Sequence, residues 1–285
     1  MRLYEGLYVK YNYDGAAYDP DIDLPSIYYH DGFTGIRLLI EQFDYAAGIT
    51  NWKAILNKAR LLPFKEIIFG LSNNAYTSAN EAAFNAALLS LATYLQSLND
   101  PRITLVIGNE LSYRHDGSVT DAHVRANART NYTACKAVYT VGKITYNMAN
   151  GEMFPFYNDF NGSALPYPWD YPSANLYTYR HGATTSGTYF TVNLSSALSW
   201  FGPTFTLSEV GPDPEGYSDT YWFDQEFYAK RFARNILAAI EKGIKVICVY
   251  NYMDANFGMI SPTGIHRAWY YTVLGLPIPN NAGMI

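Results

Sequence analysis

Charged residues are scarce in this chain of 285 residues, which has 20 Lys and Arg and 25 Asp and Glu. The charged fraction of 16% lies below the roughly 25% that is average for soluble domains. The net charge is −5, and the sequence has no basic run. Because phosphate binding needs clustered Lys and Arg, the sequence predicts no nucleic-acid partner.

Cysteine and metal-binding patterns are also nearly absent. Cys135, in a predicted helix, and Cys248, in a predicted buried strand, are the only cysteines, and we expect both to be small core residues. The 5 His residues show no metal-ligand spacing. The chain has no Gly-rich phosphate-binding loop and no Ser nucleophile elbow. The sequence therefore predicts neither a metal nor a cofactor.

Long apolar runs are missing as well. No stretch of about 18 apolar residues occurs, so we expect no membrane span. Met1–Leu3 leads directly into strand-like sequence without the apolar core of a signal peptide. The expected location is extracellular if a signal peptide was removed, and cytoplasmic otherwise. The oligomeric state is left open.

What the chain does contain is a repeated alternation of short apolar segments, polar loops and longer amphipathic segments. This alternation is typical of an α/β protein with a parallel sheet. Eight near-continuous apolar segments, as expected of strands that are covered on both faces, predict a closed (β/α)8 TIM barrel spanning residues 1–285 as one domain. The predicted strands are residues 2–10, 35–40, 66–71, 102–108, 142–148, 174–179, 204–208 and 245–250.

The connections between the strands differ in character. Residues 80–98, 121–138 and 224–242 have helical periodicity, and Gly243 follows the last of them as a left-handed cap. Residues 11–33 and 151–173 are too polar and too rich in Pro for a regular crossover helix. Each is expected to be either a wall of a cleft at the carboxyl ends of the strands or an ordinary packed surface loop.

Aromatic residues are abundant, with 27 Tyr, 15 Phe and 5 Trp. A tyrosine ring can stack on a sugar while its hydroxyl group hydrogen-bonds a sugar hydroxyl, although most such rings pack in the core or on the surface.

Two glutamates follow apolar strands in matching contexts. Glu110 ends the fourth predicted strand in VIGNEL, and Glu209 ends the seventh in TLSEVGP. Strands four and seven lie across a barrel mouth from each other, so the two carboxyl groups can converge on one bond. Paired carboxyl groups, one protonated and one ionised, are the minimum machinery of glycoside hydrolysis, and in retaining enzymes they lie about 5–5.5 Å apart. For a single glutamate, a surface salt bridge would be the alternative.

These segments resemble the clan A glycoside hydrolases over the whole chain. Asn109-Glu110 is similar to the Asn-Glu pair of the clan, and Ser208-Glu209-Val210-Gly211 is similar to its nucleophile segment. The resemblance implies that Glu110 is the acid/base, that Asn109 binds the substrate 2-hydroxyl and that Glu209 is the nucleophile.

Further positions carry the resemblance into the substrate site. Arg37 in GIRLL resembles the arginine that contacts the nucleophile in the clan, with a structural salt bridge as the alternative. Tyr177 in Asn-Leu-Tyr is similar to the tyrosine that donates a hydrogen bond to the nucleophile, and Tyr179 competes for this role. His181 is expected to lie at a substrate subsite. Many clan members have a Trp at the end of strand eight, where this chain has Tyr250 and Tyr252.

The sequence thus predicts a retaining β-glycosidase that needs no cofactor. We expect it to be endo-acting on a β-linked polysaccharide such as a β-glucan or a β-mannan. A non-catalytic carbohydrate-binding barrel and a transglycosylase that uses the same two glutamates are the alternatives.

Overall fold

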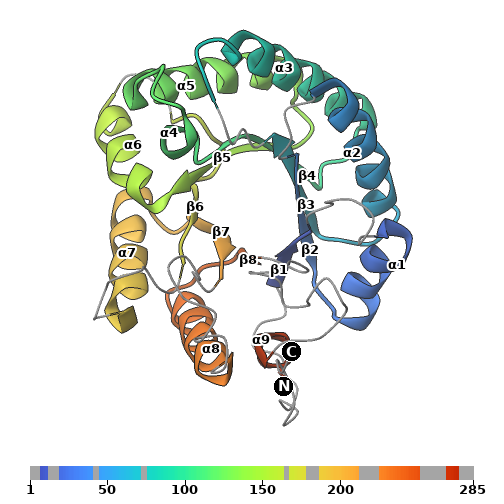
Figure 1. The fold of residues 1–285 in the computed structure, drawn as a ribbon, viewed down its shortest axis with the longest axis vertical. Coiled ribbons are helices and arrows are strands. Elements are labelled where there is room, and N and C mark those ends of the chain that lie inside the picture. Colours follow the sequence, from blue (N-terminus) through green and yellow to red (C-terminus); the bar gives the residue numbers. More distant parts are fainter. Residues whose placement is uncertain are drawn as a thin grey trace. The chain divides into compact units, whose positions relative to one another are not determined.

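The protein is a closed barrel of eight strands. The computed structural model describes residues 7–11, 19–40, 45–71, 76–163, 167–177, 186–211, 225–250 and 268–275. The strands hydrogen-bond in sequence order, and β8 returns to β1 (Figure 1). This order confirms the predicted TIM barrel. The strands are β1 Leu7–Lys10, β2 Gly35–Ile40, β3 Glu66–Leu71, β4 Ile103–Asn109, β5 Lys143–Ala149, β6 Ser173–Asn175, β7 Thr206–Val210 and β8 Ile247–Val249.

Helices occupy the connections between the strands. They are α1 Pro20–Pro25, the π-helix η1 Ser26–His30, α2 Tyr45–Arg60, α3 Glu81–Leu98, α4 Leu111–Arg114, α5 Asp121–Val138, the 3₁₀ helix η2 Asn150–Glu152, α6 Met153–Phe160, α7 Ser186–Phe201, α8 Gln225–Glu241 and α9 Ala268–Leu274.

The described residues group into two compact units, one from residues 1–36 and 176–285 and the other from residues 37–175. In the first unit, β8 pairs in parallel with both β1 and β7. In the second unit, β3, β4, β5 and β6 pair in parallel in that order. The expectation of one domain over residues 1–285 stays a prediction.

The core of the second unit follows from its apolar periodicity. All seven residues of β4 are buried, as expected for a parallel strand covered on both faces. Helix α3 buries residues at helical spacing, and Figure 1 shows α3 and α5 side by side on the outer side of β3, β4 and β5.

The predicted helices correspond to α3, α5 and α8, and Gly243 has the left-handed φ of 82° expected of a cap. Cys135 and Cys248 are buried free thiols, as predicted.

The sequence interpretation missed two short helices. Helix α1 begins within the segment 11–33, with Asp19 as its N-cap and Pro20 at its first position. Helix α6 begins within the segment 151–173 and has Pro155 in its first turn. Proline is tolerated in the first turn of a helix, where its missing N–H would have no intrahelical partner. Strand β6 is also shorter than predicted and ends at Asn175.

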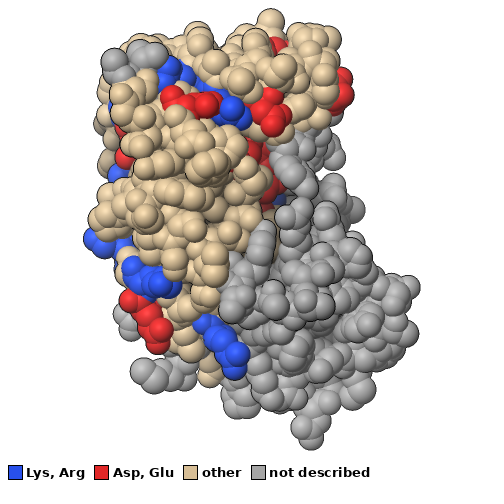
Figure 2. Space-filling view, turned by 90° about the vertical axis from the view of Figure 1, so that its left-hand side faces the viewer, with Lys and Arg blue, Asp and Glu red and all other residues tan. Residues whose placement is uncertain are grey.

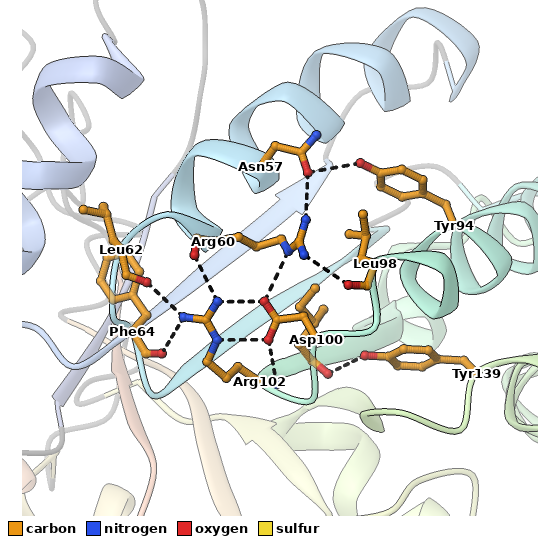
Figure 3. A network of polar contacts seen from close by, with 10 residues as sticks. Asn57, Arg60, Leu62, Phe64, Tyr94, Leu98, Asp100, Arg102 and Tyr139 are labelled. Atoms are coloured by element: carbon orange, nitrogen blue, oxygen red, sulfur yellow. Dashed lines mark hydrogen bonds and ion pairs between the residues drawn. The ribbon is translucent and has the colours of Figure 1, made fainter.

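The amino ends of β3 and β4 are joined by an ion network centred on Asp100 (Figure 3). Arg102 donates from Nε and Nη2 to the two carboxylate oxygens of Asp100, at 2.9 and 2.7 Å, and Arg60 donates from Nε to Oδ2 at 3.2 Å. Arg102 also donates to the carbonyl oxygens of Leu62 and Phe64, in the segment before β3. The hydrogen bond from Arg102 lowers the pKa of Asp100 below its ordinary value.

Replacing Asp100 with Asn should lower the free energy of unfolding by roughly 2 kcal/mol at neutral pH, because it removes charged hydrogen bonds of about 1.5–3 kcal/mol. The folded pKa of Asp100 is lowered, so its contribution is present above the unfolded pKa of about 3.9 and is lost as the pH falls through the folded pKa. Urea unfolding of the parent and of Asp100→Asn at pH 7 and pH 3 measures the difference in their free energies of unfolding. Asp159→Asn is the control, since its pair with Arg125 has a carboxylate that is 40% exposed. An equal loss at both pH values would contradict the prediction.

Charged side chains of both signs are mixed on the face that Figure 2 shows. Broad areas of this face carry no Lys, Arg, Asp or Glu. The sequence of helix α7 contains none of these four residue types. This distribution reflects the low charged fraction of the chain. Within the described ranges, none of the helices is both long and apolar enough to cross a membrane.

Candidate active site

The first unit places Glu209 between a cation and a hydroxyl group. Glu209 lies in β7, next to the carboxyl end of that strand, and is 1% exposed. Its Oε1 lies 3.7 Å from Nζ of Lys10, the last residue of β1, and both side chains are 2% exposed. Tyr177, just after β6, donates its hydroxyl hydrogen to Oε2 of Glu209. An ammonium group and a hydroxyl donor both favour the ionised form of a carboxyl group.

An aromatic ring completes this part of the site. Nζ of Lys10 lies 4.4 Å from the centroid of the Tyr250 ring, and Tyr250 meets Tyr177 edge to face at 6.0 Å. Gly211 allows the ends of β7 and β8 to approach, because a Cβ atom there would lie 2.6 Å from the carbonyl oxygen of Tyr250. Sequence reasoning identified Tyr177 and Tyr250 but missed Lys10. A lysine directly after the apolar residues Leu7–Val9 was the sequence signal that could have found it.

The second unit holds a buried cluster of one arginine, from within β2, and three asparagines, from the carboxyl-terminal parts of β4, β5 and β6. Arg37 donates from Nη2 to Oδ1 of Asn109 at 2.8 Å, and Asn175 donates to the same oxygen at 3.2 Å. The side-chain oxygen of Asn147, when turned toward Arg37, accepts from Nε at 3.3 Å and Nη2 at 2.8 Å. All four residues are at most 1% exposed, so these bonds satisfy groups that would be costly to bury alone.

Arg37 and Asn109 were both predicted to belong to the site, but a contact between them was not predicted. The structure joins them by a hydrogen bond. The predicted contact between Arg37 and Glu209 stays a prediction. Asn147 was missed, although a polar residue within the apolar strand segment ITYNMA could have indicated it.

Glu110 has an unusual backbone conformation. It follows β4 directly with φ 54° and ψ 34°, in the left-handed region, and it is 8% exposed. Its N–H donates to the carbonyl oxygen of Asn147 at 2.8 Å, beside a register shift between β4 and β5. Among the described non-glycine residues, Asn99 is the other one with a positive φ. Such conformations cost roughly 1–3 kcal/mol, and they cluster at functional sites where the surroundings enforce them.

The buried carboxyl group of Glu152 lies in the same unit as Glu110. Burial raises the pKa of Glu152 to about 7, and the negative charge of Glu110 also raises it, whereas hydrogen bonds from Ala149, Ser112 and Tyr146 lower it. Sequence reasoning missed this residue, because it lies in the segment 151–173 that was expected to be a long loop.

Three predicted site residues, Tyr179, His181 and Tyr252, lie outside the described residues. In the described part of the chain, no group of three or more His, Cys, Asp or Glu side chains could hold a metal ion.

Similarity to known proteins is found in structure and not in sequence. No protein-family model matches the chain, and no curated protein matches it. An FMN-binding β-glucuronidase from Facaelibacterium prausnitzii L2-6 has a TM-score of 0.66 at 15% identity, covering 94% of this chain and 43% of that one. A GH5_18 protein from Streptomyces cattleya, in complex with Manβ1-4GlcNAc, has a TM-score of 0.67 at 13% identity, covering 96% of this chain and 82% of that one.

A third similar structure is endo-glycoceramidase II from Rhodococcus sp., with a TM-score of 0.63 at 12% identity over 94% of this chain and 78% of that one. The chain thus spans less than half of the β-glucuronidase, at 43% of its length. Identities this low establish the architecture alone. The chain has the (β/α)8 barrel fold that it shares with these glycoside hydrolases.

Proposed function

We propose that the protein is a retaining glycoside hydrolase that cleaves β-glycosidic bonds by double displacement. Glu209 is the nucleophile and Glu110 is the acid/base. The observation that carries this proposal is the surroundings of Glu209, whose carboxyl group contacts the Lys10 ammonium and accepts a hydrogen bond from Tyr177. A buried carboxyl group whose neighbours favour its ionised form, next to the end of a barrel strand, suits the role of a nucleophile.

The reaction has two steps. The Glu209 carboxylate attacks the anomeric carbon while Glu110 donates its proton to the leaving oxygen, so a glycosyl-enzyme ester forms as the glycosidic bond breaks. The Glu110 carboxylate then takes a proton from water, and the water oxygen displaces Glu209 from the anomeric carbon. The side chains of this chain carry both steps without a cofactor. This proposal requires the two carboxyl groups to lie about 5–5.5 Å apart in the substrate complex.

Asn109 suits the role of binding the substrate 2-hydroxyl. Its Oδ1 accepts from both Arg37 and Asn175, which fixes the orientation of the amide. The Nδ2 group of Asn109 is then the donor that would reach a sugar hydroxyl. Tyr250 and, beyond the described residues, Tyr179, His181 and Tyr252 are proposed to contact the sugar rings.

The proposed substrate is a β-linked polysaccharide, such as a β-glucan or a β-mannan, cleaved within the chain. A β linkage is supported by the similar structures, since they include β-glucuronidases and a complex with Manβ1-4GlcNAc. One of them is an endo-acting enzyme by name.

Turnover of nitrophenyl β-glycosides and of soluble β-glucan and β-mannan tests this function. We expect release of nitrophenol, and a first product that retains the β configuration by NMR. Binding without turnover of any glycoside would indicate a carbohydrate-binding barrel instead. Products longer than the substrate would indicate a transglycosylase.

The partners of Glu209 should set the acidic limb of the pH profile of kcat/KM. Tyr177→Phe and Lys10→Met each remove a group that favours the ionised carboxylate, so the acidic limb should move to higher pH. The Tyr177→Phe variant should lose roughly tenfold in kcat/KM, since one hydrogen bond to a charged group contributes about 1.5 kcal/mol or more. We expect a larger loss for Lys10→Met.

Tyr11→Phe is the matched control. Tyr11 is buried and follows Lys10 directly in the sequence, but its hydroxyl group donates to Asp23. Its acidic limb should coincide with that of the parent. Since Lys10→Met breaks a buried ion pair, its thermal stability is measured in parallel. An acidic limb that stays in place in both test variants would remove Lys10 and Tyr177 from the site.

A further inference from the structure

The backbone that carries Glu110 needs support from outside its own strand. Glu110 is left-handed, and the helix that follows it, α4, has only four residues. The first amides of a helix have no partner within the helix, so their acceptors fix the direction in which the chain leaves β4. Each of the three amides from Glu110 to Ser112 has an acceptor, and all of these acceptors belong to β5 or to the segment just after it.

Two side chains accept from the amides of α4. The Tyr146 hydroxyl oxygen accepts from the N–H of Leu111 at 3.0 Å, and Oε1 of Glu152 accepts from the N–H of Ser112 at 2.7 Å. Tyr146 in turn donates its hydroxyl hydrogen to Oε1 of Glu152 at 2.9 Å. The Glu152 carboxylate is anchored by the N–H of Ala149, which donates to Oε2 at 2.6 Å. The two side chains therefore form one relay from the end of β5 to α4.

The packing of Tyr146 leaves this relay little freedom. The ring is fully buried and lies 4.9 Å from the ring of Phe156 in α6. The ring also lies against β4, where a Cβ atom at Gly108 would come within 2.7 Å of both Tyr146 and Leu111. A bulkier residue at position 108 would thus collide with the parts that the relay holds together.

We propose that Glu152, acting together with Tyr146, is a positioning residue that sets the backbone and thereby the carboxyl group of Glu110. The catalytic part of this inference rests on the proposed function. The hydrogen bonds of the relay reach the segment of Glu110 through the amides of Leu111 and Ser112, so its effect on catalysis is indirect. A loosened relay should therefore impair proton donation to the leaving oxygen more than attack by the nucleophile.

Two variants test the relay. Glu152→Gln keeps the shape but replaces one accepting oxygen with an NH₂ group, which cannot accept from an amide. Tyr146→Phe removes the acceptor of the Leu111 amide and keeps the ring, and it serves as the test if Glu152→Gln fails to fold. The matched control is Tyr139→Phe, because the buried Tyr139 hydroxyl also bonds to the β4 backbone, at the carbonyl oxygen of Ile103 near the other end of that strand.

The first measurement is amide hydrogen exchange by NMR, which needs no activity. The amides of Leu111 and Ser112 should exchange at least about tenfold faster in both relay variants than in the parent, and at the parent rate in Tyr139→Phe. Unchanged exchange in both relay variants would overturn the proposal.

The second measurement is kcat/KM for aryl glycosides with good and poor leaving groups. We expect the relay variants to lose roughly ten- to a hundredfold with phenyl glycosides and less than about threefold with dinitrophenyl glycosides, because only the former need protonation. An equal loss with both substrates would mean a merely structural role and would also overturn the proposal. If the parent hydrolyses no glycoside, the proposed function fails, and the amide exchange decides whether the relay positions Glu110.

Discussion

Glu209→Gln should lower kcat by roughly 10⁴–10⁶-fold, the range expected when a nucleophile is removed from a catalytic set. Glutamine has nearly the same shape as glutamate, but its neutral amide cannot attack the anomeric carbon. Because the substitution removes the carboxylate that pairs with the buried Lys10 ammonium, thermal stability is measured in parallel, as for Lys10→Met. The loss should be equally deep for good and poor leaving groups, because no glycosyl-enzyme forms with either.

Mass spectrometry of the intact protein with a slow fluoro-sugar substrate gives the direct readout. The parent should gain the mass of one glycosyl group on the peptide that contains β7, and Glu209→Gln should gain none. Glu241→Gln, an exposed glutamate at the end of α8, is the control and should label like the parent. Labelling of Glu209→Gln at the parental rate would exclude Glu209 as the nucleophile.

Glu110→Ala should show the second largest effect, and its size should depend on the substrate. Loss of a general acid costs roughly 10²–10⁴-fold when the leaving group needs a proton. With dinitrophenyl glycosides the first step should survive, so the glycosyl-enzyme should accumulate because no base remains to activate water. Azide, which needs no base, should then restore turnover and give a β-glycosyl azide.

The configuration of the azide product separates the two roles. A β-azide from Glu110→Ala follows from two successive inversions, one at Glu209 and one by azide. An α-azide from this variant would mean a single displacement and would reject the retaining mechanism. If the Glu110 and Glu209 variants respond alike to azide and to the leaving group, the assignment of the two roles is wrong.

The parts of the fold that were predicted correctly are those in which the local pattern and the tertiary structure agree. Strands β2 and β3 were predicted with their observed bounds, since each consists mostly of apolar residues, as expected of strands in a parallel sheet that is covered on both faces. Helix α1 was missed because its proline was interpreted as a helix breaker, although Asp19-Pro20 is a typical start of a helix.

The site could be predicted only in part, for a different reason. Glu110 and Glu209 are visible in the sequence because each follows an apolar strand. Their partners come from other strands, and only the tertiary structure decides which strand ends meet. Lys10 reaches Glu209 because β1 and β7 both pair with β8. The Glu152 relay depends in the same way on the pairing of β4 with β5.

The pair of Lys10 and Glu209 also constrains when this region can assemble on the ribosome. The two residues are separated by 209 − 10 = 199 positions, and their unit consists of residues 1–36 and 176–285. Every residue of the other unit, 37–175, has been synthesised before β7 exists. Since chains fold from the amino terminus during synthesis, residues 37–175 can begin to pack while β1 still lacks its partner β8. The edge of β1 that pairs with β8 therefore stays open until Ile247–Val249 have been synthesised, although β2, its other neighbour in the barrel, follows it closely in the sequence.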